Sequence, residues 1–393
     1  MNFFRLCKSL YSGSYMKLVI LFLVMTLAMQ SLTLAVGMLR YNHIISEQIE
    51  TLQSVRGVYL MQFEIDGTAF DKESIQHKRE QISNLPGVRQ VIHTRELYVK
   101  SGNENYTVVL YHDWMEQCFR PQHIRGEWIN TPDSAVVSAY GIKQNMIRRE
   151  MKLEFQHGSE KIVYPIEVAG VMGRASYLPK FSRSGTLLSL QGLLQPSYGH
   201  SQRYVIVSEN SELYRTYRDA FHDYRNFLVL FENKVPAETM QALSTMGLAM
   251  DFQEICRNTE KECDTTAFYV RYLMLFSSMS LLLVMGMSLN FVREKHRNLI
   301  VYTICGCSRG RKLILSCLGT LFVTILSFLL QGILVLCYYD FGLYQSLEYV
   351  AIDAASIWVL AGYTLLVNGL NLTVAYTMDG RKQPIDVLRE NRK

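Results

Sequence analysis

The sequence is poor in charged residues and lacks the short motifs of common enzyme classes. Only 19% of its 393 residues are Asp, Glu, Lys or Arg, whereas soluble domains usually contain about 25%. It has no G-x-x-x-x-G-K-[ST] phosphate loop, no H-E-x-x-H zinc motif and no G-x-S-x-G nucleophile motif. We therefore expect a chain that is no enzyme and holds no metal or cofactor. An enzyme with an unrecognised external active site is kept as a competing hypothesis.

Charge is missing altogether from four apolar runs, at residues 18–39, 272–292, 313–339 and 355–378. A membrane-spanning helix needs roughly 20 mostly apolar residues, so each run is long enough. The first run is longer than the apolar core of a typical signal peptide, which favours an uncleaved span. The predicted fold class is membrane α-helical, with four transmembrane helices in a 1+3 arrangement and an α+β extracytoplasmic domain between spans one and two. The spans are placed at residues 18–39, 271–292, 313–339 and 355–378.

The loops between these runs differ in charge. Residues 1–17, 293–312 and 379–393 together hold 14 basic and 4 acidic residues, although the net charge of the whole chain is only +5. Basic residues gather in cytosolic loops, so we expect a multi-pass protein of the cell membrane with both termini in the cytosol. Residues 40–270 and the short loop 340–354 are then extracytoplasmic. The basic excess is a topology signal and does not indicate nucleic-acid binding.

The domain at residues 40–270 has the pattern of a mixed α+β fold. Runs rich in β-branched and aromatic residues predict strands, and they lie at residues 57–65, 105–113, 134–141, 161–173, 203–209 and 226–233. Helices are expected at residues 71–84, 208–224 and 237–254. The first of these helices should stop at Pro86-Gly87.

The N-terminal segment, residues 1–17, has an amphipathic pattern. Its apolar side chains fall near one helical face: Phe3, Phe4, Leu6, Cys7, Leu10 and Tyr11. A short helix lying in the inner membrane interface and an ordinary aromatic flank explain this pattern equally well.

The cysteines give no sign of a metal or redox centre. Cys305-x-Cys307 has neither the C-x-x-C spacing nor that of a zinc half-site. Outside the membrane, Cys256 and Cys263 are separated by six residues in a polar stretch. They are expected either to form a disulfide or to stay unpaired.

Two groups of polar residues receive a structural explanation. "YHDWMEQC", residues 111–118, groups a His, an Asp and a Glu, and we interpret it as a strand end followed by a helix start. Five neutral polar residues lie within or near the predicted spans, where they are expected to form hydrogen bonds between helices in preference to lining a path for cargo. They are Gln30, Asn290, Gln331, Asn368 and Asn371.

The loop between spans two and three has the pattern of a short helix. Residues 293–304, "REKHRNLIVYTI", contain no Gly or Pro, and Leu299 and Tyr302 would lie on one apolar side. Gly306 would end the helix, and the basic stretch after it would anchor span three. Such a helix suits either a mechanical contact with a partner groove or a position on anionic lipid headgroups.

The same stretch resembles the permease subunits of the MacB/FtsX-like ABC transporter group. In that family a cytosolic helix ends in a pattern like Y-R-x-x-G-[AC]-S-R, which "VYTICGCSRGR" matches at Tyr302, Gly306, Cys307, Ser308 and Arg309. The tail "RKQPIDVLRENRK" resembles the family's closing P-x-x-x-L-R motif at Pro384, Leu388 and Arg389. Weaker similarities lie at residues 82–91, 125–144 and 166–179. The chain departs from the pattern at Asn298, where the family often has an acidic residue, and at Thr303, where it often has a basic one.

The resemblance implies a permease that binds no nucleotide itself. It implies a separate ABC ATP-binding subunit, which holds ATP and Mg, and a second permease copy, identical or not, with membrane lipid around the spans. The contact with the ATPase would involve Arg297, Leu299, Tyr302, Gly306, Ser308 and Arg309. The ATPase cycle would then move the external domain, for export, for lipid or peptide extraction, or to transmit motion across the membrane. The alternative is a stand-alone membrane receptor or adaptor whose external domain binds a ligand or a partner protein.

Overall fold

The computed structural model describes residues 12–61, 72–121, 124–138, 146–173, 176–179, 189–196, 203–304, 308–340, 350–352 and 354–381. The chain divides into two compact units. The helical unit comprises Met1–Leu39, Ala267–Tyr338 and Ile352–Lys393, and the α+β unit comprises Arg40–Thr266 and Tyr339–Ala351. Residues 1–11 of the predicted N-terminal segment 1–17 and the C-terminal motif residues Pro384, Leu388 and Arg389 lie outside the described residues.

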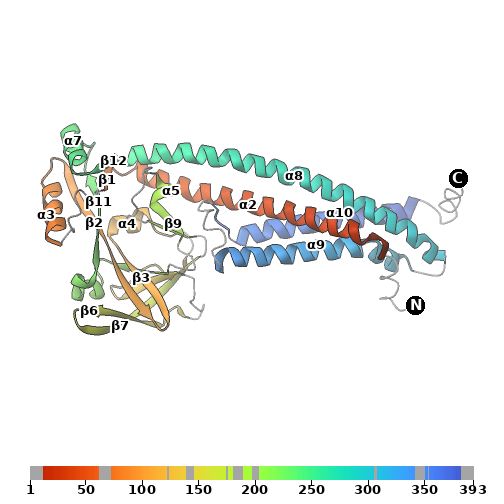
Figure 1. The fold of residues 1–393 in the computed structure, drawn as a ribbon, viewed down its shortest axis with the longest axis horizontal. Helices are drawn as coiled ribbons and strands as arrows, with labels where there is room; N and C mark the ends of the chain where they lie inside the picture. Colours follow the sequence, from red (N-terminus) through yellow and green to blue (C-terminus); the bar gives the residue numbers. More distant parts are fainter. Residues whose placement is uncertain are drawn as a thin grey trace. The chain divides into compact units, whose positions relative to one another are not determined.

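Four long helices dominate the chain (Figure 1). They are α2 (Tyr15–Gln53), α8 (Phe252–Ile304), α9 (Arg309–Asp340) and α10 (Ala354–Arg381). Each contains a segment long and apolar enough to cross a membrane. All four predicted spans fall inside these helices, so the sequence located the apolar segments correctly.

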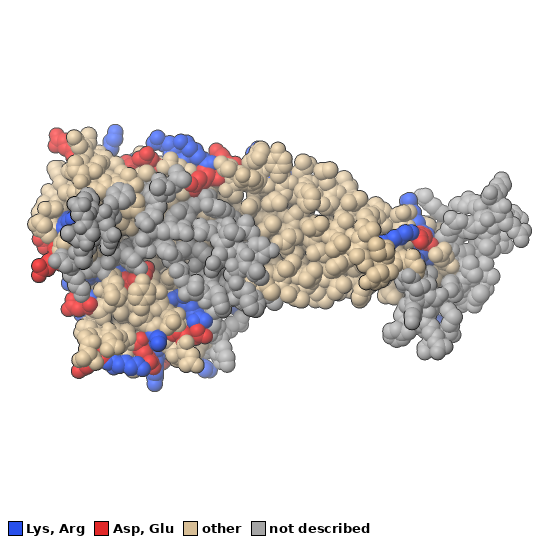
Figure 2. All heavy atoms as spheres, in the orientation of Figure 1, with Lys and Arg blue, Asp and Glu red and all other residues tan. Residues whose placement is uncertain are grey.

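The surface of the helical unit fits an apolar environment. Figure 2 shows that, on the face drawn, most of its length carries no Lys, Arg, Asp or Glu. Large apolar side chains point outward on every helix, for example Leu23, Leu282, Phe322 and Trp358, which is 76% exposed. Such a surface would be costly in water and is expected in lipid. Inside, the four helices share a core that contains Met25, Val284, Val323, Leu360 and Val367.

The helices α2 and α8 are longer than predicted. Beyond the apolar run, α2 continues to Gln53, and α8 runs for 53 residues from Phe252 to Ile304. The predicted span at 271–292 and the cytosolic helix that begins at 293 are therefore parts of one helix, and no loop separates them. The cause lies in the sequence of α8, because it contains no Pro and only one Gly, Gly286.

The α+β unit is built on one ten-stranded sheet. Its order is β12-β1-β11-β2-β3-β10-β5-β7-β4, with β6 pairing to β2 and β7. The strands are β1 (Gly57–Met61), β2 (Val88–Ser101), β3 (Glu104–Tyr111), β4 (Ile124–Gly126), β5 (Ser134–Ser138), β6 (Glu150–His157), β7 (Glu160–Met172), β10 (Tyr204–Ser208), β11 (His222–Phe231) and β12 (Leu248–Asp251). A second small sheet pairs β8 (Tyr177–Pro179) with β9 (Leu194–Pro196) beside the short helix α5 (Leu190–Leu193).

The sheet has a ring half and a layered half. Because β6 pairs with both β7 and β2, the strands β2, β3, β10, β5, β7 and β6 close into a ring around an apolar core that includes Leu97, Val108, Leu153 and Val205. In the layered half, α3 (Lys72–Ser83) and α7 (Ala237–Met246) share a core with β1, β11 and the first residues of β2. A third core joins the strands to the ends of α2 and α8 that belong to this unit.

Most of the predicted elements of the α+β unit are confirmed, with two errors among the helices. The helix predicted at 208–224 is wrong, because that stretch holds the end of β10, a short α6 (Glu212–Thr216), the 3₁₀ turn η3 (Arg218–Ala220) and the start of β11. The helix predicted at 237–254 is also wrong at residues 247–251, because Gly247 ends α7 and β12 then pairs with β1 before α8 begins at Phe252. The strand-to-helix interpretation of residues 111–118 is confirmed, since β3 ends at Tyr111 and α4 spans Asp113–Cys118.

The disulfide between Cys256 and Cys263 does not form in this structure. Neither residue is in a disulfide, and both lie on α8. Seven residues of helix separate two Cα atoms by about 10 Å, whereas a disulfide needs about 4.4–6.8 Å. Cys256 is buried, with its sulfur 4.0 Å from the backbone oxygen of Ile49, and Cys263 is half-buried. The two cysteines are therefore packing residues.

Thiol labelling without reductant tests this arrangement. In the purified, folded protein we expect Cys263 to react with a maleimide several times faster than Cys256, because Cys256 is only 1% exposed. After unfolding without reductant, both should react. Mass mapping of the labelled peptides, with Cys256→Ser and Cys263→Ser as controls, gives the result. An unlabelled pair that becomes reactive only after reduction would contradict the structure.

Candidate functional site

The predicted ATPase contact lies at the end of α8 and the start of α9. Arg297, Leu299 and Tyr302 belong to the last turns of α8, and Arg309 is the first residue of α9. Ser308 stands immediately before α9 and is exposed, and its backbone oxygen accepts the N–H of Lys312 at 3.1 Å. Gly306 lies outside the described residues, so its role as a helix stop stays a prediction. The break between the two helices does fall around it, between Ile304 and Arg309.

The last turns of α8 have a buried stripe and an exposed side. Five residues at helical spacing are buried: Phe291, Val292, Lys295, His296 and Leu299. Arg293 and Asn298 are exposed on the other side, and Glu294 is half-exposed. Among the side chains that the structure describes here, the accessible ones are therefore polar.

This pattern corrects the interpretation of Leu299. The sequence pattern predicts Leu299 on an apolar side open to a partner, but its side chain is 0% exposed. Its position eight residues after Phe291 keeps it on the buried stripe, since helical positions four apart share a face. Leu299 thus anchors α8 within the helical unit.

Two polar contacts tie α8 to the start of α2. Lys17 forms an ion pair with Glu294, with 2.6 Å between Nζ and Oε2. One residue on, the buried Lys295 donates to the Ser14 hydroxyl at 2.6 Å, and its ammonium lies 5.4 Å from the centre of the Phe291 ring. The Lys17–Glu294 pair is largely exposed, so its contribution to stability is small. The Lys295 contact is buried and fixes the register between the two helices.

A third contact reaches α9. The His296 ring nitrogen Nδ1 lies 3.4 Å from the Ser316 hydroxyl, and that hydroxyl donates to the backbone oxygen of Lys312 at 2.9 Å. Neither Lys295 nor His296 was predicted from the sequence as a contact residue. Their spacing of four and five residues from Phe291 could have placed them on the buried stripe.

Inside the helical unit, α9 carries a stripe of buried polar side chains. Ser316, Thr320, Thr324, Ser327 and Gln331 recur every three or four residues, and each is at most 2% exposed. We call these five residues the polar seam. Gln331 donates through Nε2 to Gln30 at 2.7 Å and to Thr33 at 3.1 Å, both on α2.

The fourth helix, α10, is hydrogen-bonded both to the polar seam of α9 and to α8. Asn368 of α10 donates to Thr324 at 2.8 Å. Asn371, also on α10, accepts from Ser288 of α8 at 3.0 Å. The predicted hydrogen bonds between helices are thus confirmed for Gln30, Gln331, Asn368 and Asn371. Asn290 is exposed and makes no hydrogen bond among the described residues.

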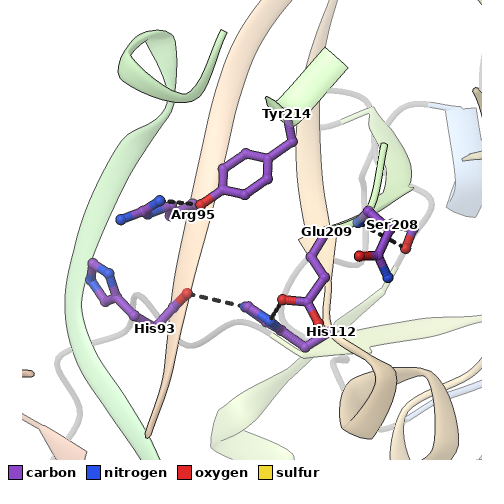
Figure 3. A network of polar contacts seen from close by, with 7 residues as sticks. His93, Arg95, His112, Ser208, Glu209 and Tyr214 are labelled. Atoms are coloured by element: carbon purple, nitrogen blue, oxygen red, sulfur yellow. Dashed lines mark hydrogen bonds and ion pairs between the residues drawn. The ribbon is translucent and has the colours of Figure 1, made fainter. Parts of the chain in front are cut away.

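The α+β unit contains a separate polar network (Figure 3). His112 follows β3, and its Nδ1 is hydrogen-bonded to the carboxylate of Glu209, which follows β10. The other ring nitrogen, Nε2, lies 3.4 Å from the backbone oxygen of His93 on β2. Beside them, the guanidinium of Arg95 is hydrogen-bonded to the Tyr214 hydroxyl.

The neighbouring carboxyl groups are shifted in opposite directions. The hydrogen bond from His112 lowers the pKa of Glu209 below its ordinary value. Burial raises the pKa of Glu116, although the Trp128 N–H donates to it at 3.1 Å and opposes the shift. The described residues contain no group of three or more His, Cys, Asp or Glu placed to hold a metal ion. The sequence showed His112 only as part of a mixed polar group, because its partner Glu209 is 97 residues away.

Gln331 offers a test of the polar seam. Replacing it with Leu removes two hydrogen bonds to α2, and interhelical bonds of this kind contribute about 0.6 kcal/mol on average. In a double-mutant cycle with Gln30→Leu, we expect Gln331→Leu to lower the free energy of unfolding and the pair to show a coupling of about that size. Unfolding in mixed micelles measures both. Ile333→Ala, at a side chain 56% exposed on the same helix, is the control, and a coupling of zero would contradict the Gln331–Gln30 contact.

Comparisons with known proteins find little. The sequence matches no protein-family model and no curated protein. Among solved structures, the extracellular domain of the noncanonic ABC-type transporter YknZ from Gram-positive bacteria is 15% identical, covers 48% of this chain and 88% of its own, and has a TM-score of 0.25. The periplasmic region of MacB from Actinobacillus actinomycetemcomitans is 10% identical, covers 53% of this chain and 96% of its own, and has a TM-score of 0.29. At these TM-scores neither likeness carries an argument about the fold or the function of this chain.

Proposed function

We propose that this chain is the permease subunit of an ABC transporter of the MacB/FtsX-like type. A separate ATP-binding subunit would hold ATP and Mg, and its cycle would move the α+β unit. The proposal starts from the motif at residues 301–311 and from the chain order, in which one apolar helix precedes the α+β residues and three follow.

The observation that carries the proposal is the continuity of α8. This helix begins directly after β12 of the α+β unit, contains the second apolar run and ends in the motif at residues 301–304. At 1.5 Å per residue, its 53 residues extend over about 80 Å. A continuous hydrogen-bonded helix transmits displacement along its axis, so a push at the cytosolic end would be felt at β12.

The contacts at this end would spread such a push. Lys17 and Ser14 link α8 to α2, and Ser316 links it to α9. A partner that displaces the exposed side at Arg293 and Asn298 would therefore move three helices together. Under this proposal the protein lies in the cell membrane with both termini in the cytosol and the α+β unit outside, next to a second permease copy and surrounded by lipid.

Asn298 provides the test. We expect Asn298→Trp to weaken co-purification with an ATPase encoded beside this chain, and to reduce stimulation of its ATP hydrolysis about tenfold, because a bulky ring would separate the two surfaces. The measurement uses the full-length chain in nanodiscs with the co-expressed ATPase. Lys261→Trp is the matched control, since Lys261 is exposed on the same helix but belongs to the α+β unit.

Two outcomes would count against the proposal. If Asn298→Trp left assembly and stimulation intact, the contact would lie elsewhere. If the wild-type chain assembled with no ATP-binding subunit, while the α+β unit retained a ligand or protein partner, the receptor or adaptor hypothesis would replace it.

A further inference from the structure

The strand β2 contributes to three cores, and its Ile92 belongs to the one that joins the strands to α2 and α8. Its first part packs in the layered half, through Val91, whereas Leu97 and Val99 belong to the core of the ring. The change falls between His93 and Glu96. Both halves of the α+β unit therefore depend on the same few residues of one strand.

The neighbouring strand is irregular at the same place. On β11, Asp223 pairs with Arg95 and Phe227 pairs with His93, so residues 224–226 stand opposite Thr94 alone. Such a bulge interrupts the regular ladder of backbone hydrogen bonds. The sheet is thus irregular where its two halves meet, and a bend at this place would break fewer hydrogen bonds than one in a regular ladder.

The His112 network bridges this junction. His112 and Glu209 follow ring strands β3 and β10, whereas the accepting oxygen belongs to His93, at the layered side of the bulge (Figure 3). The His93 ring is 4% exposed and stacks on Phe227 at 5.0 Å between centroids, which fixes the position of that oxygen. His112 is therefore positioned to tie the two halves together.

The two hydrogen-bond partners of His112 determine which protonation state of its ring can bond to both of them. A carboxylate oxygen and a backbone carbonyl oxygen both accept hydrogen bonds and cannot donate. A neutral imidazole donates through only one nitrogen, so only the imidazolium can satisfy both contacts. The other titratable or charged groups near the pair include Asp113 and Glu116 on α4, Arg79 on α3, Arg95 on β2 and the ring of His93 itself.

We propose that His112 is a pH-sensitive latch, which in its protonated form holds the ring half and the layered half of the α+β unit together across the β11 bulge. Loss of the proton removes one of the two donors and loosens the junction. Glu209 sets the limit of the latch at low pH. Its pKa is lower in the folded than in the unfolded protein, so its stabilising contribution is fully present above the unfolded pKa. That contribution is lost as the pH falls through the folded pKa. The latch does not depend on the proposed permease function.

Hydrogen exchange of the full-length protein in nanodiscs tests the latch between pH 5.5 and 8.5. After correction for intrinsic exchange rates, we expect backbone amides at residues 88–96 and 222–231 to exchange about tenfold faster at pH 8.5, because a hydrogen bond to a charged group is lost. His112→Gln should exchange fast at both pH values. His157→Gln on β6, a half-buried histidine of the same unit, should behave as the wild type.

A second variant guards against a folding defect. Glu209→Gln keeps the shape of the side chain and removes its charge, so it should reproduce the fast exchange of His112→Gln at pH 5.5 with an unchanged circular dichroism spectrum. The latch would be excluded if exchange in the wild type did not depend on pH, or if His112→Gln kept the pH dependence of the wild type.

Discussion

The unbroken hydrogen-bond ladder of α8 constrains everything else in this molecule. One helix contains the end of the α+β residues, the second apolar run and the predicted coupling segment. Bending it between these parts would break hydrogen bonds that no Pro or bulge has already weakened. Within the α+β unit, the irregular pairing of β11 with β2 is a place where the sheet is already interrupted.

Buried polar side chains of the helical unit form hydrogen bonds with one another. Polar groups in hydrocarbon must find partners within the protein, and the chain meets this with neutral amides and hydroxyls along α9 instead of charges. Gln331 is hydrogen-bonded to Gln30 on α2, and Asn368 of α10 is hydrogen-bonded to the Thr324 hydroxyl of α9. Charged groups become buried only at the end of the unit, where Lys295 reaches the Ser14 hydroxyl. The four helices are thus held in register without a Lys, Arg, Asp or Glu in the middle of the apolar runs.

The sequence predicted the features that depend on neighbouring residues. Apolar runs located the four long helices, and Pro86-Gly87 marked the end of α3. Features that depend on distant partners were missed. β12 forms because it pairs with β1, about 190 residues earlier, and Leu299 is buried because other helices cover it. β6 is an exception, since Met151, Leu153 and Phe155 alternate with charged or polar residues and this pattern could have identified the strand.

The coupling segment and the His112 latch differ in the same way, because one is formed by neighbouring residues and the other by residues far apart in the sequence. The coupling segment is contiguous, so a motif revealed it, although only the structure separates its buried stripe from its exposed polar side. The latch combines His112, Glu209 and a backbone oxygen from three segments, and no motif can encode a carbonyl. Its strength depends on one proton, whereas the cores on either side are apolar and do not titrate. A change in pH can therefore alter the junction between the halves while leaving each half folded, which is the property that a movable two-part unit needs.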